Sequence, residues 1–222
     1  LSDIQATVTD LIQANLAAIE ERMPPGLLKR WAGYGVDRWL RDRADLTRII
    51  GGSEGTLAVL TSAQLELQPL PEGKGLGAIF FATVAEAMQA TVELLELEPA
   101  AIEHIDRVLF DQTRGQVQFR KARALLELDD KPCEALLLVE FFSDITEKLA
   151  TLEAKSIGLR TTIFLDESDQ IPIWGMRKSG LSLLTGCKGA AKPTAGIEDV
   201  AILPEKLPDY VAGLQSLMKP MG

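Results

Sequence analysis

Three glycines and two hydroxyl residues form the stretch of this sequence best suited to binding chemistry. They lie in the run Gly51-Gly52-Ser53-Glu54-Gly55-Thr56, which follows the apolar pair Ile49-Ile50. Glycine lets the backbone approach another group closely, and successive turn amides can form a concavity that binds an anion. The same pattern also fits a tight turn between two strands. The spacing alone leaves both interpretations open.

The chain offers few side chains for metal or histidine chemistry. His104 is its one histidine and lies between Glu103 and Asp106, so there is little room for a His-based metal site or a Ser-His-Asp triad. We interpret it as a salt-bridged structural residue, with a catalytic base as the alternative. Cys133 and Cys187 fit neither a CxxC motif nor a disulfide framework. We expect ordinary thiols in a reducing compartment.

Composition and charge restrict the class of protein. The 222 residues, 46% of them hydrophobic, suffice for one large domain or a domain plus part of another. The 32 acids outnumber the 23 bases, and a net charge of −9 argues against nucleic acid and anionic lipid as partners. No apolar run approaches the ~20 residues of a transmembrane segment, and no signal peptide is recognisable. We expect a cytoplasmic chain, and a fragment or processed chain because it begins at Leu1.

Periodicity and chain-breaking residues divide the sequence into two parts. Residues 2–22 have apolar positions at helical spacing, whereas residues 56–68 alternate as a strand does. Residues 27–48 mix bases, aromatics and acids, which favours a surface segment with ion pairs over a nucleic-acid patch. Prolines and glycines between 69 and 75 then break the chain. We place a domain boundary there, giving domains 1–72 and 73–222.

The second part shows strand, helix, strand and then strand, helix, strand. This order predicts an α+β fold of the ferredoxin-like type, an antiparallel sheet with helices on one face. Thr83 and Glu86 form a capping box at the first helix. Residues 107–128 are mixed and helical in parts. The expected strands are 76–81, 100–108, 135–142 and 160–165, and the expected helices are 84–97 and 144–157.

The last third adds a helix beginning at 171, with Asp169 as its cap and Pro172 in its first turn. A short strand is expected over 195–203, and residues 204–208 open a final helix.

Several motifs, in order along almost the whole chain, resemble the FAD-linked oxidases. This is the vanillyl-alcohol-oxidase-like family, which includes D-lactate, glycolate and D-2-hydroxyglutarate dehydrogenases. The resemblance is greatest to its large FAD and iron–sulfur members. The motifs are G-Y-x-x-D at Gly33 to Asp37, G-S-E-G-T-L at Gly52 to Leu57, W-x-x-R at Trp174 to Arg177, K-P at Lys192-Pro193, E-D-x-A at Glu198 to Ala201, and P-E-x-L-P-x-Y at Pro204 to Tyr210.

The resemblance implies a cofactor and roles for particular residues. Gly52, Ser53, Glu54, Gly55 and Thr56 would contact the pyrophosphate of FAD. Residues 1–72 would be the end of an α+β FAD-binding domain, and residues 73–222 a truncated substrate or cap domain.

The substrate implied is a D-2-hydroxy acid, which loses a hydride to the flavin. A guanidinium binds a carboxylate with two parallel hydrogen bonds, and Arg177 takes this role in the resemblance. A solvent-facing arginine is the alternative. Lys192 would bind a second anionic group or lie on the surface. Glu198 would face the cleft or bond to backbone amides at a strand end.

The resemblance also implies that parts of the family pattern are missing. The chain lacks the first half of the flavin domain, the H-x-G-x-G-N-x-H segment and any iron–sulfur domain, so a cluster would belong to a missing domain. The chain alone should be inactive. The electron acceptor and peripheral membrane association of a longer parent stay open.

Two other functions fit the sequence less fully. A free-standing ferredoxin-like module could bind a small anion or a protein without catalysis. It would require an intact subdomain over residues 1–70. A flavin oxidase acting on alcohols would leave Arg177 without an evident partner.

Overall fold

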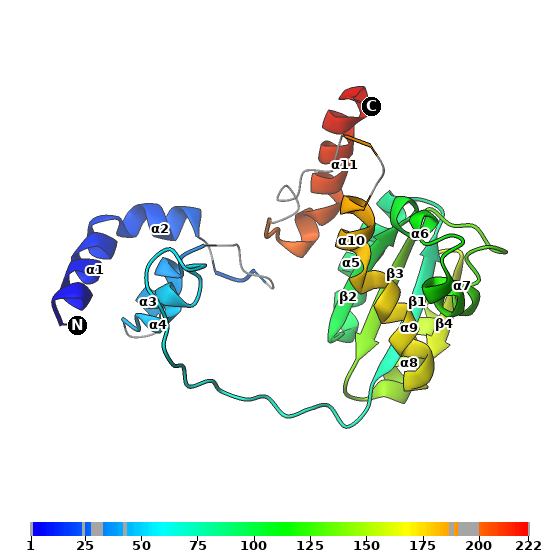
Figure 1. Cartoon of the computed structure of the whole chain (residues 1–222), viewed down its shortest axis with the longest axis horizontal. Coiled ribbons are helices and arrows are strands. Elements are labelled where there is room, and N and C mark those ends of the chain that lie inside the picture. The colour runs from blue at the N-terminus through cyan, green and yellow to red at the C-terminus, as the bar shows by residue number, and fades with distance from the viewer. Residues whose placement is uncertain are drawn as a thin grey trace. The chain divides into compact units, whose positions relative to one another are not determined.

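Four antiparallel strands form the sheet on which the larger part of this chain is built (Figure 1). The strands are β1 (Gly75–Phe81), β2 (Ala101–Asp106), β3 (Ala135–Phe141) and β4 (Arg160–Phe164), in the order β2-β3-β1-β4. The computed structural model describes residues 2–23, 25–27, 33–41, 44–186, 189–190 and 200–221. Helix α5 (Val84–Leu94) connects β1 to β2, and α8 (Ile145–Ala154) connects β3 to β4. The expected ferredoxin-like α+β fold is confirmed.

Contacts divide the chain into two compact units. One contains residues 1–68 and 195–203, and the other contains residues 69–194 and 204–222. Each unit has its own apolar cluster.

Helices cover both faces of the sheet in the larger unit. Leucines of α5 and α8, together with α11 (Leu207–Met218), pack on one face around Phe81 and Phe141. The other face, around Phe80 and Leu138, is covered by α6 (Arg107–Gln112), α7 (Arg120–Leu125), α9 (Glu167–Lys178) and α10 (Gly180–Thr185). The expectation of helices on one face is therefore wrong. Every residue of β1 and β3 is buried, and a strand buried on both sides reads as a continuous apolar run.

Local signals place the first helix of this unit. The Thr83 side chain accepts a hydrogen bond from the Glu86 amide at 3.1 Å, and the Glu86 carboxylate accepts one from the Ala82 amide at 3.2 Å. The capping role of Thr83 is confirmed. After α5, a 3₁₀ turn over Leu95–Leu97 completes the helical segment expected over 84–97. Further 3₁₀ turns span Val117–Phe119, Pro204–Lys206 and Lys219–Met221.

The smaller unit contains short helices and a small core. They are α1 (Ser2–Ala14), α2 (Leu16–Arg22), α3 (Val36–Arg41) and α4 (Thr47–Ile50). Among the described residues of this unit, Ile12, Trp39 and Ile49 form the buried apolar cluster. The single helix expected over 2–22 breaks at Asn15, whose side chain donates to the Leu11 carbonyl at 2.8 Å. Asparagine competes with the helix for backbone partners in this way.

The strand expected over 56–68 is wrong. Residues 58–70 have no regular secondary structure, and they expose Val59, Leu67 and Leu70 to 92%, 86% and 91%. A strand needs a neighbouring strand to receive its backbone hydrogen bonds, and the described residues supply none here. Residues 200–203 form no strand either, and the rest of the expected strand lies outside the described residues.

Gly158 ends the connection from α8 to β4, and its conformation gives a stability prediction. It has φ +72°, and an added Cβ would lie 2.5 Å from the Phe80 carbonyl oxygen. Gly158→Ala should therefore combine a left-handed backbone cost of about 1–2 kcal/mol with an overpacking cost of about 1–3 kcal/mol. Urea denaturation measures the sum.

Gly115→Ala is the matched control for this substitution. Gly115 has φ +77°, but no atom lies within 4 Å of an added Cβ. It should show only the backbone cost of about 1–2 kcal/mol. Equal losses in the two variants would mean that the contact with Phe80 is not limiting.

Candidate functional site

Arg177 and Glu103 form an ion pair between α9 and β2. The Arg177 Nε and Nη2 atoms both donate to Glu103 Oε2, at 3.0 and 2.7 Å. The two side chains are 37% and 28% exposed, so the pair is open to solvent on one side. Within the described part of the chain, Nη1 of Arg177 has no hydrogen-bond partner. The guanidinium is thus half engaged by the protein and keeps one edge for another acceptor.

Helix α9, which carries Arg177, is held to the sheet by an amide side chain. Gln170 is buried, and its Nε2 donates to the carbonyl oxygens of Lys74, Phe164 and Leu165 at 3.0 to 3.2 Å. Ile173 and Met176 are buried in the apolar cluster of the same sheet face. These contacts anchor α9 to the sheet in the two turns that precede Arg177.

The start of α9 differs from the sequence expectation. The helix begins at Glu167 with Asp166 as its N-cap residue, so Pro172 lies inside the helix and Asp169 is not the cap. A proline inside a helix leaves the carbonyl four residues earlier without its donor. Here Lys121 Nζ donates to that carbonyl, of Ser168, at 2.7 Å and pairs with Asp169 at 2.9 Å. This replacement from α7 explains how the helix tolerates the proline.

A second carboxylate faces α9 from β3. Glu140 pairs with Ala101 in the register, so it lies on the same sheet face as Glu103, one diagonal step away. It is only 9% exposed. Burial raises the pKa of Glu140, while Lys74, the Trp174 indole and Lys178 act in the opposite direction. The Trp174 Nε1 atom is buried without a well-aligned hydrogen bond among the described residues, so its effect on Glu140 is that of a nearby dipole.

His104 lies on the opposite face of the sheet, across from Leu137. Burial lowers the pKa of His104, Asp106 raises it and Arg177 lowers it further. The expected salt bridge to its acidic neighbours is wrong. The Glu103 carboxylate is taken by Arg177, and Asp106 caps α6 by accepting from the Leu109 amide at 3.0 Å. His104 Nε2 is buried and has no partner in the described ranges.

In the smaller unit, two of the motifs meet. The Tyr34 hydroxyl lies 2.7 Å from the Thr56 hydroxyl, which joins the G-Y-x-x-D segment to the glycine turn. Thr56 also donates from its amide and its hydroxyl to the Ser53 carbonyl, at 3.0 and 2.6 Å. Glu54 and Gly55 have φ of +49° and +78°, the sign pattern of a type I′ turn.

The amides of this turn divide into engaged and free ones. The Gly52 and Ser53 amides donate to the carbonyls of Ile49 and Ile50 and so continue α4. Those of Glu54 and Gly55 have no acceptor in the described part of the chain, and both residues are exposed. Space around a Cβ on Gly55 is open. Two free amides and an open approach fit an anionic group such as a phosphate.

Four residues singled out from the sequence cannot be placed. Lys192, Pro193, Glu198 and Asp199 lie outside the described residues, as does Cys187. Their predicted roles stay predictions.

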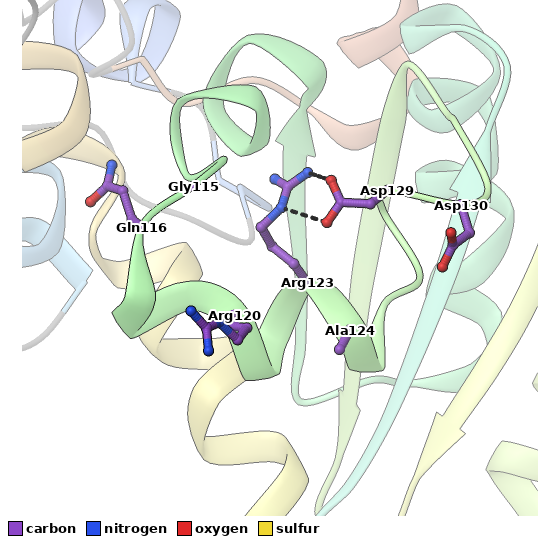
Figure 2. Close-up of a pocket in the computed structure, with 7 residues that line it drawn as sticks. All are labelled: Gly115, Gln116, Arg120, Arg123, Ala124, Asp129 and Asp130. Atoms are coloured by element: carbon purple, nitrogen blue, oxygen red, sulfur yellow. Dashed lines mark hydrogen bonds and ion pairs between the residues drawn. The ribbon is translucent and has the colours of Figure 1, made fainter.

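A pocket of about 330 Å³ lies beside α7, and no motif in the sequence indicates it. Figure 2 shows Arg123 reaching Asp129 on the wall of this pocket. Arg123 is buried, and it also donates to the Phe110 carbonyl at 2.5 Å and the Thr113 hydroxyl at 2.9 Å. Its nitrogens are all used within the fold, so it ties a loop to α7 and α6 and is not available to a ligand. Arg123 lies in no motif, so the sequence did not predict that its side chain is buried.

The described residues contain no group of three or more acids, histidines or cysteines that could hold a metal ion. Nor, among them, is there a helix with the length and hydropathy needed to cross a membrane.

Comparison with known proteins agrees with the fold and the motifs. Residues 70–222 match the family described as "FAD linked oxidases, C-terminal domain". The chain belongs to this family of flavin-linked oxidoreductases.

Similar proteins extend the comparison to most of the chain. It is 31% identical over 215 residues to a D-2-hydroxyglutarate dehydrogenase of Pantoea ananatis, covering 89% of this chain and 21% of that protein. The protein of the same name from Escherichia coli is 29% identical over 217 residues, with the same shares. Glycolate oxidase subunit GlcD of Bacillus subtilis is 27% identical over 180 residues, covering 78% of this chain and 36% of that protein. The chain thus spans about a fifth of the length of the dehydrogenases it matches.

The buried Glu140 gives a prediction about pH. Its pKa in the fold lies above the ordinary value of 4.5. The bound proton therefore stabilises the fold below the unfolded pKa, and that stability is lost as pH rises through the folded pKa. Relative to Glu140→Gln, which does not titrate, the wild-type chain should lose free energy of unfolding from about pH 4.5 upward.

Asp129→Asn is the control, because the contribution of Asp129 to the free energy of unfolding should change with pH in the opposite direction. The Arg123 guanidinium lowers the pKa of Asp129, so its contribution is present above the unfolded pKa and is lost as pH falls. Urea denaturation of the three proteins from acidic to neutral pH measures both slopes. Parallel slopes for the two variants would refute the burial argument for Glu140.

Proposed function

We propose that this chain is the substrate-binding C-terminal part of an FAD-dependent dehydrogenase that oxidises a D-2-hydroxy acid. The observation that carries the proposal is the free Nη1 edge of Arg177 on α9, at the arginine of the W-x-x-R motif. Glycolate and D-2-hydroxyglutarate in the names of similar proteins support this substrate class.

The chemistry of a 2-hydroxy acid suits this site. Its carboxylate sits one bond from the carbon to be oxidised, so a guanidinium that binds the carboxylate also orients the reacting C–H bond. FAD, when bound, would accept the hydride. Arg177 would bind and orient the substrate. Lys192 and Glu198 stay proposals of the resemblance, Lys192 for a distal carboxylate such as that of 2-hydroxyglutarate.

The glycine turn of the smaller unit would serve the cofactor. The free amides of Glu54 and Gly55 suit a pyrophosphate oxygen, and the Tyr34–Thr56 contact would hold the turn in shape. Gly52 and Ser53 would contribute shape more than hydrogen bonds, because their amides are already engaged with α4.

The chain should act within a longer protein and be inactive alone. It spans about a fifth of the dehydrogenases it matches. Among the described residues of the smaller unit, three apolar residues are buried in a core, whereas residues 58–70 expose several. Exposed apolar surface of this kind marks a contact with further protein. A free-standing binding module, the second function considered, would instead require that the smaller unit form an intact subdomain by itself. An iron–sulfur cluster in a further domain stays a prediction of the resemblance.

Removal of the Arg177 guanidinium tests the substrate assignment. In the complete flavoprotein, Arg177→Met should lower kcat/KM for D-2-hydroxy acids roughly 10- to 150-fold, because a hydrogen bond to a charged group contributes about 1.5–3 kcal/mol. Steady-state kinetics over D-2-hydroxyglutarate, D-lactate and glycolate measures the loss.

Arg107→Met is the matched control, since Arg107 also pairs with a glutamate, Glu134, at 2.5 Å but lies on α6. It should keep wild-type kinetics. Wild-type kinetics for Arg177→Met as well would remove the carboxylate clamp from this proposal.

Removal of the Tyr34 hydroxyl tests the cofactor assignment. Tyr34→Phe in the complete flavoprotein should weaken FAD binding roughly 2- to 10-fold, the effect of one neutral hydrogen bond worth about 0.5–1.5 kcal/mol. Flavin fluorescence titration of the apoprotein measures it. Tyr210→Phe, which removes the hydroxyl of the other tyrosine, on α11, serves as the control. An unchanged flavin affinity for Tyr34→Phe would argue against a role for the turn.

A further inference from the structure

The contact between Glu103 and Arg177 is one-sided. A single carboxylate oxygen, Oε2, accepts from both Nε and Nη2. A guanidinium is planar and carries five N–H donors, so two donors on one edge fix the plane of the whole group. The donors of Nη1 lie on the remaining edge. Gly180, at the start of α10, borders that edge: a Cβ built on it would lie 3.9 Å from Nη1. A methyl group there would be in van der Waals contact with Nη1.

Attachment of α9 does not depend on this ion pair. Gln170 makes three hydrogen bonds to the backbone of the sheet, and Lys121 holds the Ser168 carbonyl and Asp169. Ile173 and Met176 are buried completely. A partly exposed ion pair contributes only about 0–1 kcal/mol to stability. The Glu103 carboxylate therefore adds little to the stability of α9, because the other contacts already hold this helix to the sheet.

The negative charge of Glu103 also argues against a role in binding strength. Glu103 neutralises the guanidinium that would bind an anion, which lowers general anion affinity. A carboxylate placed there for binding strength alone would be counterproductive. Its benefit is geometric, because a side chain with several rotatable bonds is held in one orientation before the ligand arrives.

We propose that Glu103 is a positioning residue that aims the Nη1 edge of Arg177 at the substrate carboxylate. The inference rests on the proposed function of Arg177 and adds a second residue to it. Glu103 itself does not touch the substrate. It lowers the affinity of Arg177 for anions but improves the orientation of the bound acid.

The test is Glu103→Gln in the complete flavoprotein, with kcat and KM measured separately. The neutral amide oxygen of glutamine accepts more weakly than a carboxylate oxygen, and the looser orientation should lower kcat about 10- to 100-fold, the scale of a small misplacement of the reacting groups. Loss of the negative charge should leave KM no higher than in the wild type. The competitive inhibition constant of the 2-oxo acid product, which carries the same carboxylate, should likewise stay equal or become lower.

Glu93→Gln is the matched control. Glu93 pairs with Lys155 at 3.3 Å between α5 and α8, on the other face of the sheet. The variant makes the same change of charge and should keep wild-type kcat and KM.

Each outcome decides the question. A merely structural Glu103 predicts a lower melting temperature with kcat and KM both impaired, and an irrelevant one predicts wild-type kinetics; either result overturns the positioning role. If Glu103→Gln is silent but Arg177→Met is severely impaired, the proposed function stands and this inference fails. If both variants are silent, the clamp and the positioning role fail together.

The doubly reversed variant, Glu103→Arg with Arg177→Glu, adds an independent check. It exchanges the two charges and so keeps an ion pair between positions 103 and 177. Its melting temperature should therefore equal that of the wild type. Its guanidinium extends from β2 instead of α9, so its donors lie elsewhere than those of Arg177 and turnover should stay lost. Recovery of turnover in this variant would overturn the inference.

Discussion

Burial of β1 and β3 along their whole length is the constraint on which the rest of the structure depends. Both strands are buried at every position and, apart from Glu140 near the end of β3, carry only apolar residues, so they need cover on both sides. The two crossover helices α5 and α8 can cover only one face. The chain between β2 and β3, and the chain after β4, must fold back over the other face, and α9 comes to lie there as a result. The position of Arg177 is thus a consequence of the core.

The second face is also where charge enters the fold. Glu103 and Glu140 stand on adjacent strands, and α9 brings Trp174, Arg177 and Lys178 toward them. Each acid is matched by cations or dipoles, which offsets the cost of their partial burial. Lys121 similarly compensates for Pro172. Polar contacts at the edges of the apolar cluster determine the orientation of a helix that apolar packing alone would leave less specified.

Elements with strong local signals could be predicted from the sequence. The four strands, the Thr83 cap and the order of helices followed from apolar runs and capping residues. Helical cover on the second face could not, because α6, α7 and α10 are short and bury residues scattered over a long segment. Pro172 usually marks a first turn and so predicts a cap at Asp169, but the donor to the carbonyl that this proline leaves unpaired comes from distant Lys121. The Arg177–Glu103 pair joins residues 74 positions apart, a separation that no local pattern encodes. Burial of Arg123 depended likewise on a loop that carries no recognisable motif.

The extended segment over residues 58–70 determines where proteases would cut this chain in solution. It joins the two units, exposes leucines and valine, and its amides receive no acceptors from the described residues. Endoproteases require a segment of about this kind, extended and accessible, to fit their active-site clefts. Cleavage there would leave the sheet on one fragment, with Arg177 and Glu103 still paired. The lifetime of the uncut chain would then report how often this segment is covered by other protein.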